Sequence, residues 1–201
     1  ADYDYNVVRW SSEPDGNLLG IGPSVSNPLT GEIISADVVN KLLAIKLGYN
    51  YRKLYGYTED NDPLMQYITN LTLHEVGHVL GLRHNFRGSY LYSPDEIHDK
   101  NITGNVLMSS VMDYDPINIA PEGVEQGIYF STEPGVYDKW AVKFGYTPNL
   151  TDEERTALLQ QSVKRELTFG TDDDAMSYPG NNIDPRTKRY DMSNDPIAYA
   201  E

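Results

Sequence analysis

The sequence has 201 residues, 39% of them hydrophobic, a length and composition that suit one globular domain with a buried core rather than a disordered chain. Its net charge of −14 argues against nucleic acid and anionic membranes as partners, because both would repel the protein. The absence of cysteine excludes disulfides, thiolate metal ligands and a cysteine nucleophile, and no apolar run approaches the roughly 20 residues that span a bilayer.

The first part of the chain predicts a small sheet followed by a helix. Residues 6–11, 18–26 and 32–38 are rich in β-branched and apolar residues and are expected to be extended, the last two around a turn at 27–31. Apolar residues at 38, 42, 45 and 49 then predict a helix over 37–55 that ends at Gly56. The strand–helix boundary lies between 36 and 40.

A second helix carries the most informative motif. Asn61 or Asp62 is expected to cap it, Pro63 to occupy its first turn, and the helix to run to about Leu80. Residues 74–84, within and just beyond this helix, read HEVGHVLGLRH.

This spacing predicts a zinc site. His74 and His78 are four residues apart, so both lie on one face of a helix and can reach the same ion. Gly81 can adopt a positive φ, end the helix and turn the chain back, so that His84 supplies a third imidazole. Three nitrogen ligands leave a fourth position open, as in catalytic rather than structural zinc sites. Glu75, beside the first histidine, can act on a metal-bound water without being a ligand.

Chance is a weak explanation for this motif. A shorter HExxH pattern can occur on a helix surface, but the longer form specifies five residues, and three of the four histidines of the chain fall within it. The fourth, His98, is interpreted as an ordinary histidine of a loop or helix surface.

The rest of the chain is predicted to be helical in places and otherwise irregular. A short helix is expected after Ser93 and Pro94, loops over 101–131, a helix over 133–144 that ends at Gly145, and a helix from the capping box at 151–154 to about Leu167. The tail from Gly170 is turn-rich. Residues 195–201 resemble the start of a helix that stops early, which suggests that the chain is a piece of a longer protein.

Together, the motif and the later run SVMDY at 110–114 resemble the metzincin clan of zinc endopeptidases. Met112 fits the Met-turn of that clan, where the methionine lies beneath the metal. Asn85, after the third histidine, matches neither the acidic residue of astacins and adamalysins nor the proline of serralysins. Segments 27–36 and 184–199 look most like the large bacterial Met-zincin-type proteins of poorly characterised function. The clan's motif is matched at His74, Glu75, His78, Gly81 and His84.

Tyr114 follows the Met-turn methionine by two residues, where astacins and serralysins have a tyrosine that can bind zinc and then hold the oxyanion. A phenol beside a Lewis acid could be a ligand or a hydrogen-bond donor. The alternative is a tyrosine packed in the core. We assign Tyr114 a catalytic role.

The resemblance implies an α+β fold: a metzincin-like zincin with a small twisted sheet, an active-site helix above the zinc, and an irregular, helix-containing C-terminal subdomain. We expect one metallopeptidase catalytic domain over 1–201, with subdomains 1–81 and 82–201, excised from a longer parent chain. We expect an extracytoplasmic protein, secreted or periplasmic.

The expected function is that of a zinc endopeptidase. Zn²⁺ would be held by His74, His78 and His84, and Glu75 would activate a metal-bound water against peptide or protein substrates. Two alternatives remain open: a catalytically idle zinc module that binds a partner, and an amidohydrolase of non-peptide substrates. The substrate is expected to add a strand beside segment 18–26. The acidic run at 172–174 lacks calcium-loop spacing, so no calcium site is predicted.

Overall fold

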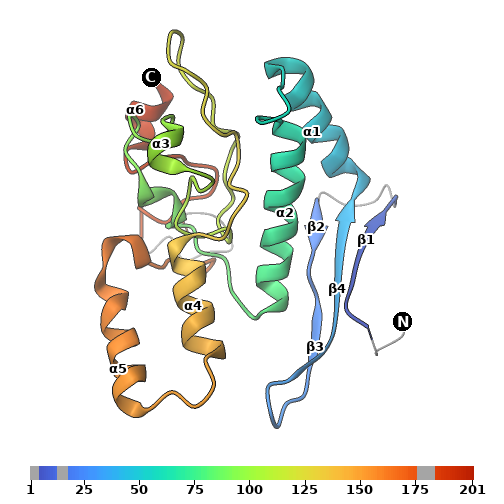
Figure 1. The fold of residues 1–201 in the computed structure, drawn as a ribbon, viewed down its shortest axis with the longest axis vertical. Coiled ribbons are helices and arrows are strands. Elements are labelled where there is room, and N and C mark those ends of the chain that lie inside the picture. Colours follow the sequence, from blue (N-terminus) through green and yellow to red (C-terminus); the bar gives the residue numbers. More distant parts are fainter. Residues whose placement is uncertain (1–4, 13–17, 176–183) are drawn as a thin grey trace. The chain divides into compact units, whose positions relative to one another are not determined.

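In a computed structural model of the protein, the described residues are 5–12, 18–175 and 184–201. The chain divides into two compact units, Ala1–Leu82 and Arg83–Glu201. The first unit contains a small mixed sheet and two long helices, and the second is built from short helices and irregular segments (Figure 1). The predicted α+β fold class is therefore confirmed.

The sheet of the first unit is organised around one long strand, β4 (Ile33–Lys41). Strand β1 (Val7–Ser11) pairs with it in parallel, and β2 (Gly20–Ile21) and β3 (Ser24–Ser26) pair with it antiparallel. Strands β1, β2 and β3 lie within segments predicted to be extended, and β4 begins in the third such segment and continues beyond its predicted end at Val38. The predicted start of the first helix at Asp37 is wrong, because β4 continues to Lys41 and the helix begins at Leu42. Val39 pairs with β1 on one side and with β2 on the other, and sheet pairing outweighs the helical spacing of the apolar residues.

Two helices complete the first unit. Helix α1 (Leu42–Tyr55) ends at Gly56, whose φ of 77° is the positive value expected of a glycine after a helix. Helix α2 (Pro63–Val79) begins as predicted, with Asp62 as its cap accepting from the backbone nitrogen of Leu64 at 3.0 Å. The two helices pack closely at Gly48, where a Cβ would lie 2.7 Å from Cδ1 of Leu64.

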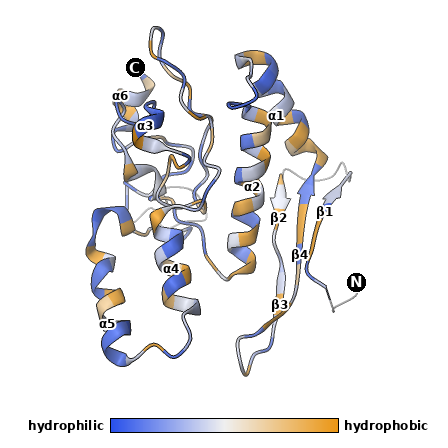
Figure 2. Ribbon diagram, viewed as in Figure 1, coloured by the Kyte–Doolittle hydropathy of each residue, from blue (hydrophilic) through white to orange (hydrophobic). Residues whose placement is uncertain are grey.

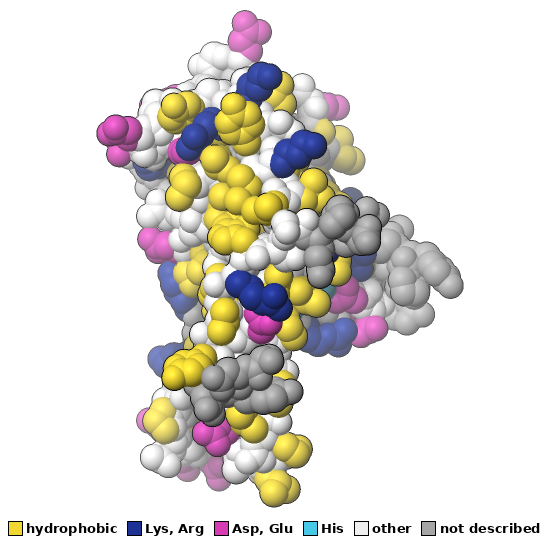
Figure 3. Space-filling view, turned by 90° about the vertical axis from the view of Figure 1, so that its right-hand side faces the viewer, with side chains coloured by type: hydrophobic (Ala, Val, Ile, Leu, Met, Phe, Trp, Pro, Cys, Tyr) yellow, Lys and Arg dark blue, Asp and Glu magenta, His cyan; other side chains and the backbone are white. Residues whose placement is uncertain are grey.

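Helix α2 packs against the sheet through β4 and β2. Asn40 of β4 is buried and its amide donates to Oγ1 of Thr72 on α2 at 2.9 Å. Hydrophobic and hydrophilic residues are mixed along both elements (Figure 2). Other large side chains of the strands are exposed, among them Val8, Trp10 and Val25, and Figure 3 shows hydrophobic side chains gathered on one face of the molecule.

The second unit differs from prediction in its short helices. The 3-10 helix η1 (Gly88–Leu91) precedes a turn over 94–98, where a helix was predicted, and α3 (Lys100–Thr103) follows it. Helix α4 (Val136–Tyr146) begins three residues later than predicted. Helix α5 (Asp152–Gln160) has the predicted capping box at Thr151 but does not reach Leu167. Two 3-10 helices, η2 (Gln161–Val163) and η3 (Arg165–Leu167), and the terminal α6 (Pro196–Ala200) complete this unit.

The core of the second unit brings together loop residues far apart in sequence. Its centre is formed by Ile97, Leu107, Met108, Ile128 and Met192. Trp140 of α4 donates to the carbonyl of Leu158 on α5 at 3.0 Å and joins these two helices. Within the described ranges, no helix has the length and apolar character needed to cross a bilayer.

Candidate metal centre

Helix α2 presents the first two histidines on one face. The ring centroids of His74 and His78 are 4.8 Å apart, in an edge-to-face arrangement, as the four-residue spacing requires. Nδ1 of His78 lies 3.0 Å from the carbonyl oxygen of Leu82. Since a carbonyl only accepts, Nδ1 carries the proton and Nε2 keeps the lone pair that a metal needs.

The end of α2 turns the chain at Gly81, as predicted. Gly81 has a φ of 83°, and the backbone nitrogen of Leu82 donates to the carbonyl of Gly77 at 3.0 Å. A hydrogen bond that spans six residues and encloses a glycine in the left-handed region is a common way to end a helix before the chain reverses direction. Only five residues separate His78 from His84, so the turn keeps the third histidine near the first two.

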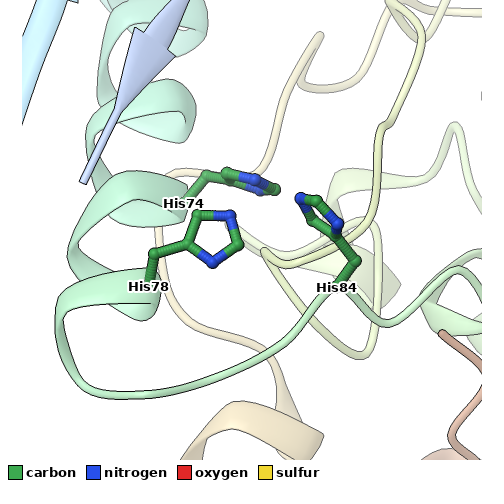
Figure 4. Close-up of side chains that lie close together, drawn as sticks. All are labelled: His74, His78 and His84. Carbon is green, nitrogen blue, oxygen red and sulfur yellow. The ribbon is translucent and has the colours of Figure 1, made fainter. Parts of the chain in front are cut away.

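The three histidines form one potential metal site. His74, His78 and His84 each offer a ring nitrogen, and these atoms lie within 4.8 Å of one another (Figure 4). Three imidazoles at this spacing can converge on one ion, and such a donor set suits zinc. Across the described part of the chain, no acidic side chain joins this group. A fourth ligand to an ion held there would have to come from outside this group of three imidazoles.

His84 is held by neighbours from its own unit. Its Nδ1 lies 2.9 Å from Oδ2 of Asp172, and its ring stacks on Phe86 with centroids 5.1 Å apart. The phenol oxygen of Tyr114 lies 2.9 Å from Nε2 of His84. The hydroxyl of Tyr114 is thus beside the nitrogen that remains for the metal, and it does not point into a hydrophobic core.

Glu75 is buried and lies against strand β2. The residue is 5% exposed, and burial raises the pKa of the carboxyl group to about 7. A Cβ atom on Gly20 would lie 2.5 Å from Oε1 of Glu75, and one on Gly22 would lie 2.1 Å from the carbonyl oxygen of Glu75. A carboxyl group with a pKa near 7 can both take up and release a proton at neutral pH.

The predicted Met-turn is buried and held by one acidic residue. Met112 has no exposed surface, and its carbonyl accepts from the backbone nitrogen of Asn85 at 3.0 Å. Asp138 of α4 accepts from Oγ of Ser110 at 2.6 Å and from the backbone nitrogen of Val111 at 2.8 Å. The turn is therefore fixed to α4 and to the segment that follows His84.

Sequence reasoning missed one contact of the site and misplaced one histidine outside it. Asp172 belongs to an acidic run considered only for calcium, and its contact with His84 spans 88 residues, so no local pattern could predict it. His98 was interpreted as an ordinary histidine of a loop or helix surface; it lies in a turn, but it is 7% exposed and stacks on Tyr199, with 5.6 Å between ring centroids. The helix-surface alternative is wrong, because the turn over 94–98 folds into the core, where Ile97 is fully buried.

The sequence of the chain matches one known protein family. The sequence model of the family described as Met-zincin matches residues 57–201, which is well over half of the chain. The chain belongs to the Met-zincin family. The match includes α2, the three histidines and the Met-turn, and begins after the sheet. No curated protein and no solved structure matches the chain.

Membership of the Met-zincin family confirms the resemblance predicted from the motif and residues 110–114. It also agrees with the α+β architecture and with a metal held by three histidines. A zinc metallopeptidase-like module is the description that family and geometry support together.

Proposed function

We propose that this Met-zincin is a zinc-dependent endopeptidase. The observation that carries the proposal is the group of three imidazoles with a spacing suited to one ion, two of them on the helix that also carries the buried Glu75. His74, His78 and His84 would hold the ion. Zinc bound there supplies a Lewis acid that polarises a carbonyl and makes water more acidic.

Glu75 is proposed as the general base and then the general acid. It would take the proton of the attacking water and deliver it to the leaving amine. Its pKa of about 7, raised by burial, supports both steps, because a base near neutrality can accept a proton and return it. Tyr114 would donate a hydrogen bond to the oxyanion that develops on the substrate. Its hydroxyl lies 2.9 Å from Nε2 of His84, which supports this role.

The edge formed by β2 and β3 is the proposed path of the substrate. Both strands pair with β4, and within the described residues neither has a second partner strand. A peptide could add to this edge through its backbone. Gly20 and Gly22 lie along it directly beside Glu75, which would bring a bound peptide bond near the general base.

The main alternative is a zinc module that binds partners without catalysis. Glu75 argues against it, because a structural site needs no buried carboxyl group of raised pKa beside its ligands. An amidohydrolase of other substrates would use the same centre, and only substrate tests separate it from a peptidase. The single-domain organisation over 1–201 and the extracytoplasmic location remain predictions.

The test measures zinc content and cleavage of unfolded casein by the parent, Glu75→Gln and His78→Ala. We expect about one zinc per parent molecule, no zinc in His78→Ala, and cleavage that a chelator abolishes and zinc restores. Glu75→Gln should keep its zinc and lose at least about 100-fold in rate. The control is His98→Phe, which changes the histidine outside the centre and should keep both zinc and activity.

Two results would contradict the proposal. Equal zinc in the parent and in His78→Ala would remove the metal centre. Cleavage of casein and of a peptide library by neither the parent nor its variants, with zinc bound, would favour the idle module or the amidohydrolase.

A further inference from the structure

Asp172 makes two directed contacts, both within the second unit. Its Oδ2 lies 2.9 Å from Nδ1 of His84, and its Oδ1 accepts from the guanidinium of Arg189 at 3.1 Å. An ionised carboxylate only accepts, so the contact requires the proton of His84 to be on Nδ1. Nε2 is then the unprotonated nitrogen, on the side of the ring where Tyr114 lies.

The three adjacent carboxylates of the acidic run have three different partners. Asp172 alone contacts a histidine of the metal centre. Asp173 pairs with Arg83, and the side chains of both are more than half exposed. Asp174 accepts from the backbone nitrogen of Thr171 and closes a local turn. The contact of Asp172 is therefore specific to one position of the run and does not follow from its general negative charge.

Asn85 holds the segment that leads to Asp172. This side chain is fully buried; its amide nitrogen donates to the carbonyl of Thr168 at 3.1 Å, and its oxygen accepts from the backbone nitrogen of Gly170 at 3.2 Å. The backbone nitrogen of Phe86 donates to the carbonyl of Gly170 at 2.7 Å. The two residues after His84 thus bind the backbone just before Asp172. An aspartate side chain at position 85 could not donate to the carbonyl of Thr168, and a proline could neither donate to Thr168 nor accept from Gly170.

Arg189 is itself held in place. Its guanidinium lies 4.8 Å from the ring centre of Phe86 and 6.0 Å from that of Tyr114. Phe86 also stacks on His84, so the arginine, the carboxylate and the imidazole are arranged around one aromatic ring. An isolated surface ion pair would contribute little, but a carboxylate oriented on both oxygens has little freedom to leave the imidazole.

We propose that Asp172 is a positioning residue of the metal centre. It fixes the tautomer and orientation of His84 so that Nε2 is available to the metal, Arg189 orients Asp172, and Asn85 fastens the segment that carries it. Hydrogen bonds from a carboxylate to a metal-binding histidine raise metal affinity, and their loss costs about 10- to 100-fold. The inference relies on the proposed function only for metal binding and makes no claim about catalysis.

The experiment measures the zinc dissociation constant by competition with a chromophoric chelator. Asp172→Ala should weaken zinc binding about 10- to 100-fold. Asp172→Asn should recover part of the loss, because its amide oxygen can still accept from Nδ1 of His84. Asp173→Asn removes the same charge one residue away and should bind zinc as the parent does. Nitrogen-15 NMR of the zinc-free proteins should show His84 protonated at Nδ1 in the parent and a mixture of tautomers in Asp172→Ala.

The outcomes separate this inference from the proposed function. Zinc binding within twofold of the parent in both Asp172 variants, with a tautomer unchanged, would overturn the inference and leave the proposed function intact. A parent that binds no zinc would overturn both. Melting temperatures without zinc identify a variant that fails to fold. If Asp172→Ala fails to fold, the test rests on Asp172→Asn, and a zinc dissociation constant of Asp172→Asn equal to that of the parent counts against the inference.

Discussion

Glu75 lies directly beneath Gly20 of strand β2. A Cβ at Gly20 would come within 2.5 Å of Oε1 and 2.9 Å of Cδ of the glutamate. Two residues along, a Cβ at Gly22 would meet the backbone carbonyl of Glu75 at 2.1 Å. A Cβ at Gly20 would meet the end of the Glu75 side chain, which can move. A Cβ at Gly22 would meet the backbone of Glu75, which cannot, so substitutions at the two glycines should have different consequences.

Gly20→Ala should displace the carboxyl group without unfolding the protein. We expect zinc to remain bound and the rate of casein cleavage to fall roughly 10- to 100-fold, since a shift of about 1 Å in a reacting group has effects of this size. Gly145→Ala is the matched control, because beyond the adjoining residues and backbone of its own helix nothing lies within 4 Å of the added Cβ. Activity equal to the parent in Gly20→Ala would mean that the position of Glu75 is not critical. Gly22→Ala should lower the melting temperature as well.

Tyr114→Phe tests the phenol beside His84. The ring volume is preserved, so a packing role predicts little change beyond the loss of a hydrogen bond. An oxyanion role predicts that kcat falls roughly 10-fold or more with KM little altered, because the contact exists mainly in the transition state. We expect the second result. Tyr129→Phe, at a buried tyrosine outside the centre, is the control. Unchanged kinetics in Tyr114→Phe would remove this residue from the mechanism.

Asp138→Asn should destabilise the Met-turn. The carboxylate of Asp138 accepts three hydrogen bonds, including one from the backbone nitrogen of Gly135 at 2.8 Å, and an amide cannot accept all of them. We expect the free energy of unfolding to fall by about 3 kcal/mol, measured in urea. Asp152→Asn, in the exposed first turn of α5, should cost less than about 1 kcal/mol. Equal losses in the two variants would mean that the Met-turn does not depend on this carboxylate.

His98 should make the protein less stable in mild acid. Burial lowers the pKa of its imidazole, and in the described part of the chain its Nδ1 has no hydrogen-bond partner. Below about pH 6.5, the unfolded chain binds a proton that the folded protein binds less readily, so stability falls as pH falls. One proton contributes a slope of up to about 1.4 kcal/mol per pH unit.

His98→Phe preserves the stacking on Tyr199 and removes the titrating group. Urea unfolding at pH 7.5 and 5.5 should show a smaller loss of stability in the variant than in the parent. Parallel pH profiles for the two proteins would show that His98 does not contribute to acid sensitivity.

Local chemistry made much of the fold and centre predictable. The start of α2 follows from Asp62 and Pro63, its end from Gly81, and the convergence of two histidines from their spacing on a helix. The same logic failed at 37–41. There, apolar residues at helical intervals belong to a central strand, because pairing on both sides of β4 decided their conformation.

The sequence by itself determined the candidate ligand set, the candidate base and the resemblance to the family, since these depend on motifs of residues close together in the chain. Only the tertiary structure decided that Asp172 contacts His84, that Asn85 fastens residues 168–170, and that two glycines lie against Glu75. Those contacts join segments from about 50 to 90 residues apart. A hydrogen bond between distant residues depends on how the whole unit packs, and no periodicity or spacing in the sequence encodes it.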